Sequence, residues 1–122
     1  MEGKRVLIAD DTAFMRMTLR NVLEQNGLQV VAEAKDGAEA AEKYAEFKPD
    51  VVTMDITMPN VDGISAVKKI ISSDPNAKII MVSAMGQKSL VVEALTSGAK
   101  DFIIKPFTPA RVIEALKNAI SR

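Results

Sequence analysis

Five short apolar runs recur along the chain, and polar residues bound each of them. They occupy residues 6–9, 30–32, 51–54, 79–82 and 102–104. The runs are nearly unbroken and rich in Val and Ile, which is typical of strands covered on both faces in a parallel sheet. The pattern therefore predicts five buried strands.

Longer segments with the 3.6-residue period of a helix follow these runs. The positions that we expect to face the core are Met15, Leu19, Val22 and Leu23 in the first segment, Ile64, Val67 and Ile71 in the third, Val91, Ala94 and Leu95 in the fourth, and Val112, Ile113, Leu116 and Ile120 in the fifth. Local signals mark the ends of the segments. They are a stop at Gly27, a capping-box pattern of Asp36 with Glu39, a helix end before Pro49, a stop at Gly98, and an N-cap with a first-turn proline at Thr108 and Pro109.

The order of these segments predicts the fold class. Strand and helix alternate five times, and parallel neighbours need right-handed crossovers. The expected architecture is a three-layer α/β/α sandwich around a parallel sheet. In such sheets the binding site forms at the carboxyl ends of the strands, where the strand order reverses.

Composition narrows the possible chemistry. The 122 residues suffice for one domain, and Lys+Arg and Asp+Glu both count 16. A formal charge of zero argues against non-specific nucleic-acid binding. The absence of Cys and His excludes disulfides, zinc–thiolate sites and histidine-based catalysis. No apolar run exceeds four residues, where about 20 are needed to span a bilayer, so we expect a cytoplasmic protein without membrane insertion.

Polar residues stand at four of the predicted strand ends. They are Asp10 and Asp11, then Asp55, then Ser83, and finally Lys105. Each has an ordinary structural explanation when taken alone, as a helix cap, a turn residue or a solvated side chain. Together they should converge at one edge of the sheet, and three crowded carboxylates repel one another unless a cation joins them. Mg²⁺ prefers such oxygen ligands and often shares its site with phosphate.

The same residues suit phosphoryl transfer. An Asp can attack phosphorus, while a metal, a Lys and a Ser hydroxyl stabilise the phosphoryl oxygens. The six glycines are never closer than ten positions apart, which excludes the glycine-rich phosphate loops of nucleotide sites. A protein of this kind needs a donor that is already phosphorylated.

The ensemble of motifs resembles the receiver domain of two-component response regulators. The motifs are Asp10-Asp11, Asp55-Ile56-Thr57-Met58-Pro59 followed by Asp62-Gly63, Ser83-Ala84, and Lys105-Pro106-Phe107. The resemblance covers residues 1–122 as one receiver domain, and it is strongest to single-domain chemotaxis regulators of non-enteric bacteria. It implies the flavodoxin-like strand order 2-1-3-4-5.

The resemblance also implies residue roles. Asp55 would accept the phosphoryl group, and Asp10, Asp11, Asp55 and the backbone carbonyl of Thr57 would hold Mg²⁺. Ser83 and Lys105 would bind the phosphoryl group, and the Lys105–Pro106 peptide bond would be cis. Ser83 and Phe102 would act as the switch, changing the face formed by the fourth helix, fifth strand and fifth helix. Two residues depart from common family patterns, since many receivers have Thr at position 83 and enteric chemotaxis regulators have Tyr at position 102.

The implied partners are proteins. They are a CheA-like histidine sensor kinase as the donor, a flagellar motor switch protein as the target, and a phosphatase. We expect a monomer that catalyses only its own phosphorylation and dephosphorylation. Three alternatives remain: a receiver of another phosphorelay, a haloacid-dehalogenase-type phosphatase, and a flavodoxin-like cofactor-binding module. The phosphatase class wants an Asp two residues after the nucleophile, where this chain has Thr57, and an acidic rim would repel a flavin phosphate.

Overall fold

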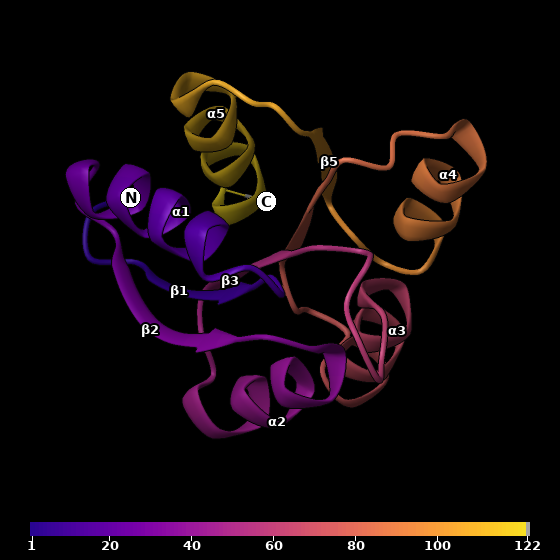
Figure 1. Cartoon of the computed structure of the whole chain (residues 1–122). Coiled ribbons are helices and arrows are strands. Elements are labelled where there is room, and N and C mark those ends of the chain that lie inside the picture. Colours follow the sequence, from indigo (N-terminus) through magenta and orange to yellow (C-terminus); the bar gives the residue numbers. More distant parts are fainter. Residues whose placement is uncertain (122) are drawn as a thin grey trace.

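Five strands and five helices alternate along the chain in the computed structural model, which describes residues 1–121 (Figure 1). The strands are β1 (Arg5–Ala9), β2 (Gln29–Ala34), β3 (Val51–Met54), β4 (Ile79–Ser83) and β5 (Asp101–Ile104). The helices are α1 (Ala13–Gln25), α2 (Gly37–Phe47), α3 (Gly63–Ser73), α4 (Lys88–Thr96) and α5 (Pro109–Ile120). Every strand begins within one residue of its predicted apolar run.

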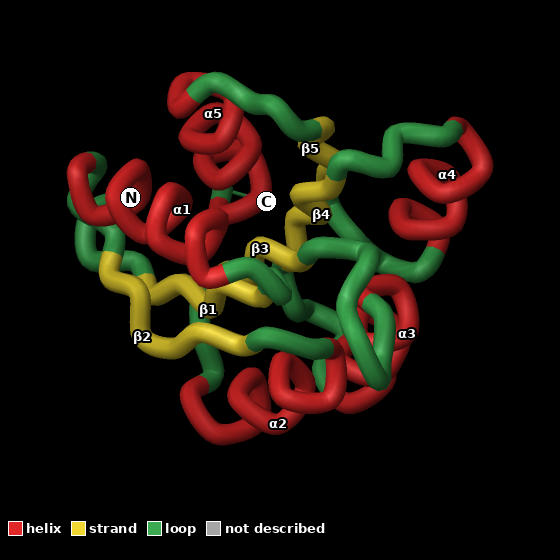
Figure 2. The backbone as a smooth tube through the Cα atoms, in the orientation of Figure 1, coloured by secondary structure: helices red, strands yellow, loops and turns green. Residues whose placement is uncertain are grey.

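All five strands form one parallel sheet in the order β2-β1-β3-β4-β5, which confirms the expected topology (Figure 2). The register pairs Ala9 with Met54 and Ser83 with Ile104. Because these pairs lie at the strand ends, the residues that follow them emerge at one edge. The sheet order reverses between β1 and β3, and in folds of this kind the binding site lies at that point of the carboxyl edge.

Two hydrophobic cores lie on opposite faces of the sheet. Helices α2, α3 and α4 cover one face and α1 and α5 the other (Figure 1). Successive side chains of a strand point to opposite faces. Leu7 and Ala9 therefore join the first core, while Val6 and Ile8 join the second. No helix within residues 1–121 has the length and apolar character needed to cross a membrane.

Several burial predictions were wrong in detail. Strand β2 is only partly buried because it lies at the sheet edge, so it is not covered on both faces as its apolar run suggested. On α4, Leu95 is 43% exposed, and on α3 it is Ile70 that is fully buried while Ile71 is only partly so. A helix that rests on a neighbour along a narrow stripe buries fewer positions than its apolar period indicates. Four further predicted core residues, Met15, Val91, Ile113 and Ile120, are only partly buried, although they pack against the two cores as expected.

Side-chain caps fix where four of the helices begin. The carboxylates of Asp36 and Asp62 and the hydroxyls of Thr12 and Thr108 each accept a hydrogen bond from the backbone N–H three residues later. The capping box predicted at α2 is modified, since the Glu39 carboxylate accepts from the backbone N–H of Lys35 and not from that of Asp36.

Candidate metal centre

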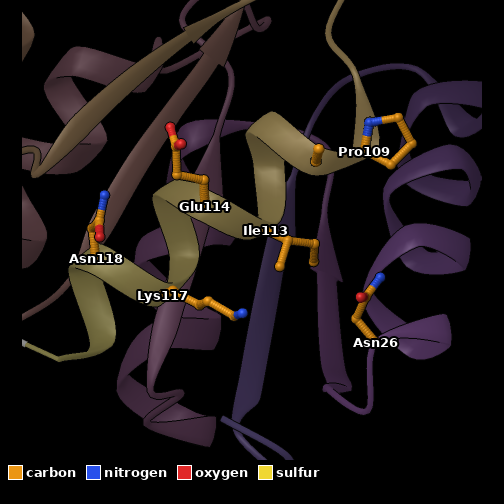
Figure 3. A pocket seen from close by; sticks show the side chains of 7 residues that line it. Asn26, Pro109, Ile113, Glu114, Lys117 and Asn118 are labelled. Carbon is orange, nitrogen blue, oxygen red and sulfur yellow. The ribbon is translucent and has the colours of Figure 1, made fainter.

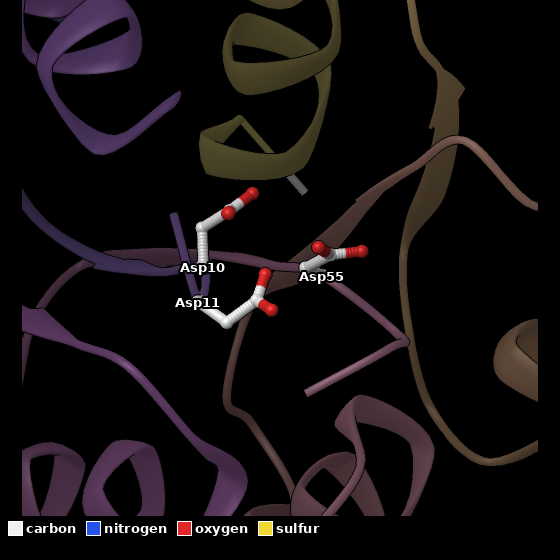
Figure 4. Close-up of side chains that lie close together, drawn as sticks. All are labelled: Asp10, Asp11 and Asp55. Atoms are coloured by element: carbon white, nitrogen blue, oxygen red, sulfur yellow. The ribbon is translucent and has the colours of Figure 1, made fainter. Parts of the chain in front are cut away.

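Three carboxylates meet at the carboxyl edge of the sheet (Figure 4). One oxygen from each of Asp10, Asp11 and Asp55 lies within 4.8 Å of the others. Asp10 and Asp55 follow the neighbouring strands β1 and β3 and are buried, while Asp11 is exposed. The predicted convergence of these residues is therefore confirmed, and we call the three the acidic cluster.

Asp10 is held at every polar atom. Its backbone N–H donates to the carbonyl of Ala34 at 3.0 Å. One carboxylate oxygen accepts from the backbone N–H and the hydroxyl of Thr12, at 2.9 and 3.0 Å. The other accepts from the Lys105 ammonium at 2.8 Å, and the backbone carbonyl accepts from Arg16 at 2.7 Å. This carboxylate cannot rotate without breaking several bonds.

Lys105 brings a positive charge to the cluster from the last strand. Its ammonium lies 2.8 Å from Asp10 Oδ2 and 3.4 Å from Asp55 Oδ2. The backbone N–H of Lys105 donates to the carbonyl of Ser83 at 2.9 Å, and the Lys105–Pro106 bond is cis, as the resemblance implied. Burial by itself would lower the pKa of Lys105, but the hydrogen bonds and charges of the two carboxylates outweigh it and raise that pKa. The ammonium therefore stays charged at neutral pH.

The Asp55 carboxyl lies in an environment that disfavours its charge. Burial is the largest cause, and the neighbouring charge of Asp10 adds to it. The charge of Lys105 opposes both but does not cancel them, so the pKa of Asp55 is raised. A cation that joined the cluster would remove this penalty.

Gly63 closes the loop below Asp55. Its N–H donates to the carbonyl of Ile56 at 2.7 Å, and a Cβ at this position would lie only 1.8 Å from the backbone oxygen of Asp55. No residue with a side chain fits here without moving the backbone of the loop.

Three further predicted site residues lie on β4, on β5 and in the loop after β3. Ser83 is buried, and its hydroxyl accepts a hydrogen bond from the backbone N–H of Met85 at 3.1 Å. Phe102 is buried in the core shared by α2, α3 and α4, with 9% of the residue exposed. Thr57 is exposed, and its hydroxyl donates to the sulfur of Met85 at 2.9 Å.

A hollow elsewhere on the surface is separate from the cluster. It has a volume of about 410 Å³ and lies along α5 beside the end of α1, lined by residues that include Asn26, Ile113 and Lys117 (Figure 3). None of its lining residues belongs to the acidic cluster.

The donor set fits a hard divalent cation. All three ligand atoms are carboxylate oxygens, the class that Mg²⁺ prefers, and the exposed Asp11 leaves the site open to water. A site with protein ligands on one side and solvent on the other suits an ion that keeps several waters and binds phosphate oxygens.

The sequence alone assigned no role to three residues that build the site. Thr12 and Arg16 hold Asp10, and Gly63 fits against Asp55. Gly63 is part of the Asp62-Gly63 motif of the sequence, but its contact with the backbone of Asp55 is visible only in the structure. Nothing in the periodicity distinguishes Arg16 from a solvated helix residue.

A family model described as "Response regulator receiver domain" matches residues 6–117. Chemotaxis protein CheY of Thermotoga maritima is 61% identical over 120 residues, which cover 98% of this chain and 99% of that protein. Chemotaxis protein CheY of Bacillus subtilis is 57% identical over 117 residues, covering 96% and 98%.

Solved structures agree with these relatives. The response regulator domain of Thermotoga maritima CheB superimposes with a TM-score of 0.93 at 41% identity, covering 99% of this chain and 98% of that one. CheY in the CheX-CheY-BeF3-Mg+2 complex from Borrelia burgdorferi gives a TM-score of 0.93 at 39% identity, covering 96% and 89%.

Proposed function

This chain belongs to the response regulator receiver domain family, as a regulator of the chemotaxis kind, and from that premise we propose that it accepts a phosphoryl group on Asp55. The observation that carries the proposal is the acidic cluster with the Lys105 ammonium inside it. Receiver domains are signalling domains, so the phosphorylated state is itself the output. We further propose that residues 1–122 form one such domain.

The transfer would be an in-line displacement. An oxygen of the Asp55 carboxylate attacks the phosphorus of a phosphohistidine on a sensor kinase of the CheA-like class. The new P–O bond forms as the P–N bond breaks, and its electron pair stays on the imidazole nitrogen, which takes a proton from solvent. Asp55 suits this role because it is buried beside a cation and its charge is poorly stabilised.

The neighbouring residues would stabilise the charge that the phosphoryl oxygens carry. Lys105, already 3.4 Å from the Asp55 carboxylate, would pair with one oxygen. Asp10, Asp11, Asp55 and the carbonyl of Thr57 would hold Mg²⁺. Bound there, Mg²⁺ would neutralise negative charge on the phosphoryl oxygens. The Borrelia complex contains Mg²⁺ with BeF3, which supports this assignment.

Ser83 would pass the signal from the site to the surface. Its hydroxyl accepts from Met85 and donates to no acceptor within residues 1–121, so its hydrogen is available to a phosphoryl oxygen. Drawing Ser83 towards that oxygen would shift the segment leading into α4. Phe102 would follow as the second switch residue. Its ring is already buried without the phosphoryl group, so we expect a shift in the population of its packing arrangements and not an entry from solvent.

The face formed by α4, β5 and α5 would then bind the target. It carries the exposed apolar side chains Val92, Leu95 and Ile104, which suit a protein partner. We propose the flagellar motor switch as that target and a phosphatase as a further partner. The Borrelia CheY in complex with CheX is a relative bound to another protein.

Labelling by a small phosphodonor tests the acceptor. Incubation with acetyl phosphate and Mg²⁺ should give one acid-stable, base-labile phosphoryl group, and Asp55→Asn should abolish it. Asp62→Asn is the matched control, because Asp62 is an exposed acid in the same loop region and Asn is an equally good N-cap. Full labelling of Asp55→Asn would reject Asp55 as the acceptor.

Binding of the target tests transmission. Ser83→Ala keeps the nucleophile and the carboxylates, so it should be labelled at Asp55 yet bind a flagellar switch protein more weakly than the labelled wild type. Pull-down with each form, labelled and unlabelled, makes the comparison. Equal binding by labelled Ser83→Ala and labelled wild type would remove Ser83 from the switch.

A further inference from the structure

The peptide bond between Asp10 and Asp11 is fixed by a side chain from the first turn of α1. Arg16 on α1 donates from Nη1 to the backbone carbonyl of Asp10 at 2.7 Å. A carbonyl oxygen and the following N–H share one rigid plane. Holding this carbonyl therefore fixes the direction in which the chain leaves Asp10 towards Asp11.

Arg16 is itself held from the other side. Its Nε donates to a carboxylate oxygen of Glu33 on β2 at 3.0 Å, and the Arg16 side chain is only 19% exposed. Glu33 in turn is fixed by its pairing with Ile8 in the sheet and by Lys43, which donates to its backbone carbonyl at 2.6 Å. The guanidinium thus spans a fixed strand and the Asp10 carbonyl with two different nitrogens.

Asp11 depends on this anchor more than the other two carboxylates of the cluster do. Asp10 is bound by Thr12 and Lys105, and Asp55 by Lys105. The Asp11 side chain makes no hydrogen bond or ion pair within the described part of the chain. Its position relative to the cluster is set by its backbone alone.

We propose that Arg16 is a positioning residue for the metal centre, which orients Asp11 through the carbonyl of Asp10. The proposal rests on the proposed function in that the cation is the Mg²⁺ of the phosphoryl-transfer site. Residues that orient metal ligands from outside typically change metal affinity by about 10- to 100-fold when they are removed. We expect the lower end here, about 10-fold, because only one of the three carboxylates is affected.

The positive charge of Arg16 would change the Mg²⁺ affinity in the opposite direction. A guanidinium close to the cluster repels a divalent cation, so its removal would tighten Mg²⁺ binding if charge were its main effect. A weaker affinity after removal can come only from lost positioning or lost folding.

Arg20 provides a matched control. It lies one turn further along α1 and donates to the same Glu33 carboxylate at 2.6 and 2.9 Å, with a second contact to Glu24. It donates no hydrogen bond to the Asp10 carbonyl. Arg16→Met and Arg20→Met therefore each remove one positive charge and the hydrogen bonds to the Glu33 carboxylate. Only Arg16→Met also removes the hydrogen bond to the Asp10 carbonyl.

The experiment is calorimetric titration of Mg²⁺ into chelator-treated protein, with a thermal melt of each variant in EDTA. Arg16→Met should raise the Mg²⁺ dissociation constant about 10-fold, and Arg20→Met should change it less than two-fold. At saturating Mg²⁺, labelling of Arg16→Met by acetyl phosphate should return to the wild-type rate, because Arg16 does not touch Asp55. Unchanged or tighter Mg²⁺ binding by Arg16→Met, or an equal loss in both variants, would overturn the proposal.

A second variant covers the case in which Arg16→Met does not fold. Glu33→Gln keeps Arg16 but weakens the bond that orients it, and should raise the dissociation constant about three-fold, a fraction of the roughly 10-fold loss expected for full removal. An unchanged constant in Glu33→Gln would then count against the proposal. Measurements on the wild type distinguish a failure of this proposal from a failure of the proposed function. If the wild type neither binds Mg²⁺ nor is labelled at Asp55, the phosphoryl site itself is rejected. If the wild type does both and only the variants behave unexpectedly, the role of Arg16 is rejected.

Discussion

Replacing Asp11 by Asn should make the metal-free protein more stable. The substitution removes one negative charge from the acidic cluster at nearly constant volume. Because the Asp11 side chain is exposed and makes no hydrogen bond or ion pair within residues 1–121, it gives up no favourable contact. The repulsion from Asp10 and Asp55 is the main interaction that disappears.

The geometry sets the size of this effect. Two unit charges 4.8 Å apart repel by about 0.9 kcal/mol at the dielectric constant of water and by about 3.5 kcal/mol at an effective value of 20. Asp11 is exposed, so the value near water applies to each of its two neighbours. Attraction to Lys105 offsets part of the sum, which leaves roughly 1 kcal/mol in favour of the variant. For a domain of this size that corresponds to about 4 °C in melting temperature.

Mg²⁺ should reverse the order of the melting temperatures of wild type and Asp11→Asn. A ligand that binds only the folded state stabilises it by about 2.7 kcal/mol at 100 times its dissociation constant. Asp11→Asn lacks one of the three carboxylates and should lose most of that gain. Wild type should therefore melt below the variant in EDTA and above it in Mg²⁺.

Thermal melts of both proteins in EDTA and in saturating Mg²⁺ make the measurement. Glu46→Gln is the control, because it removes the charge of an exposed acid on α2 that forms no ion pair within residues 1–121. It should melt with wild type in both conditions. If Asp11→Asn is no more stable than wild type in EDTA, or gains as much from Mg²⁺, the electrostatic reasoning about the cluster is wrong.

Three further predictions concern the residues around the cluster. Gly63→Ala should cost at least about 3 kcal/mol in urea unfolding, because its Cβ would meet the backbone of Asp55, while Gly86→Ala meets only a flexible side chain and should cost less. The raised pKa of Asp55 means that the folded state binds more protons than the unfolded chain above pH 3.8. The free energy of unfolding of the metal-free protein should therefore fall as the pH rises from there. Urea melts between pH 4 and 7 should show a smaller fall for Asp55→Asn than for wild type. Thr53→Val should be neutral or stabilising by about 1 kcal/mol in the same assay, because it replaces a buried hydroxyl that has no hydrogen-bond partner, and a clear loss would point to a partner such as a buried water.

The fold could be predicted where burial alone decides the structure. Val51–Met54 is buried at every residue, and its observed bounds match the apolar run. Strand β2 was harder, because its partial exposure follows from its place at the sheet edge, and apolar periodicity carries no information about strand order. Leu95 was misassigned for a related reason, since the helical period gives an apolar side but not how much of it a neighbour covers.

The acidic cluster could be predicted because topology brings it together. Once β1, β3 and β5 are parallel, Asp10, Asp55 and Lys105 must emerge at one edge. The contacts that orient them could not be predicted. Whether Arg16 reaches the Asp10 carbonyl depends on a rotamer and on Glu33 from another strand, and neither appears in the local sequence.

The contact between Lys105 and Asp10 joins residues 95 positions apart. Contacts this distant along the chain form late, because closing the intervening loop costs conformational entropy before any contact repays it. During synthesis, the first three strands and the acidic cluster can emerge long before β5 is available to supply the ammonium. A partly folded chain would thus display carboxylates that repel one another and lack the cation needed to stabilise an incoming phosphoryl group. Under the proposed function, an incompletely folded chain would therefore accept a phosphoryl group poorly until the last strand has joined the sheet.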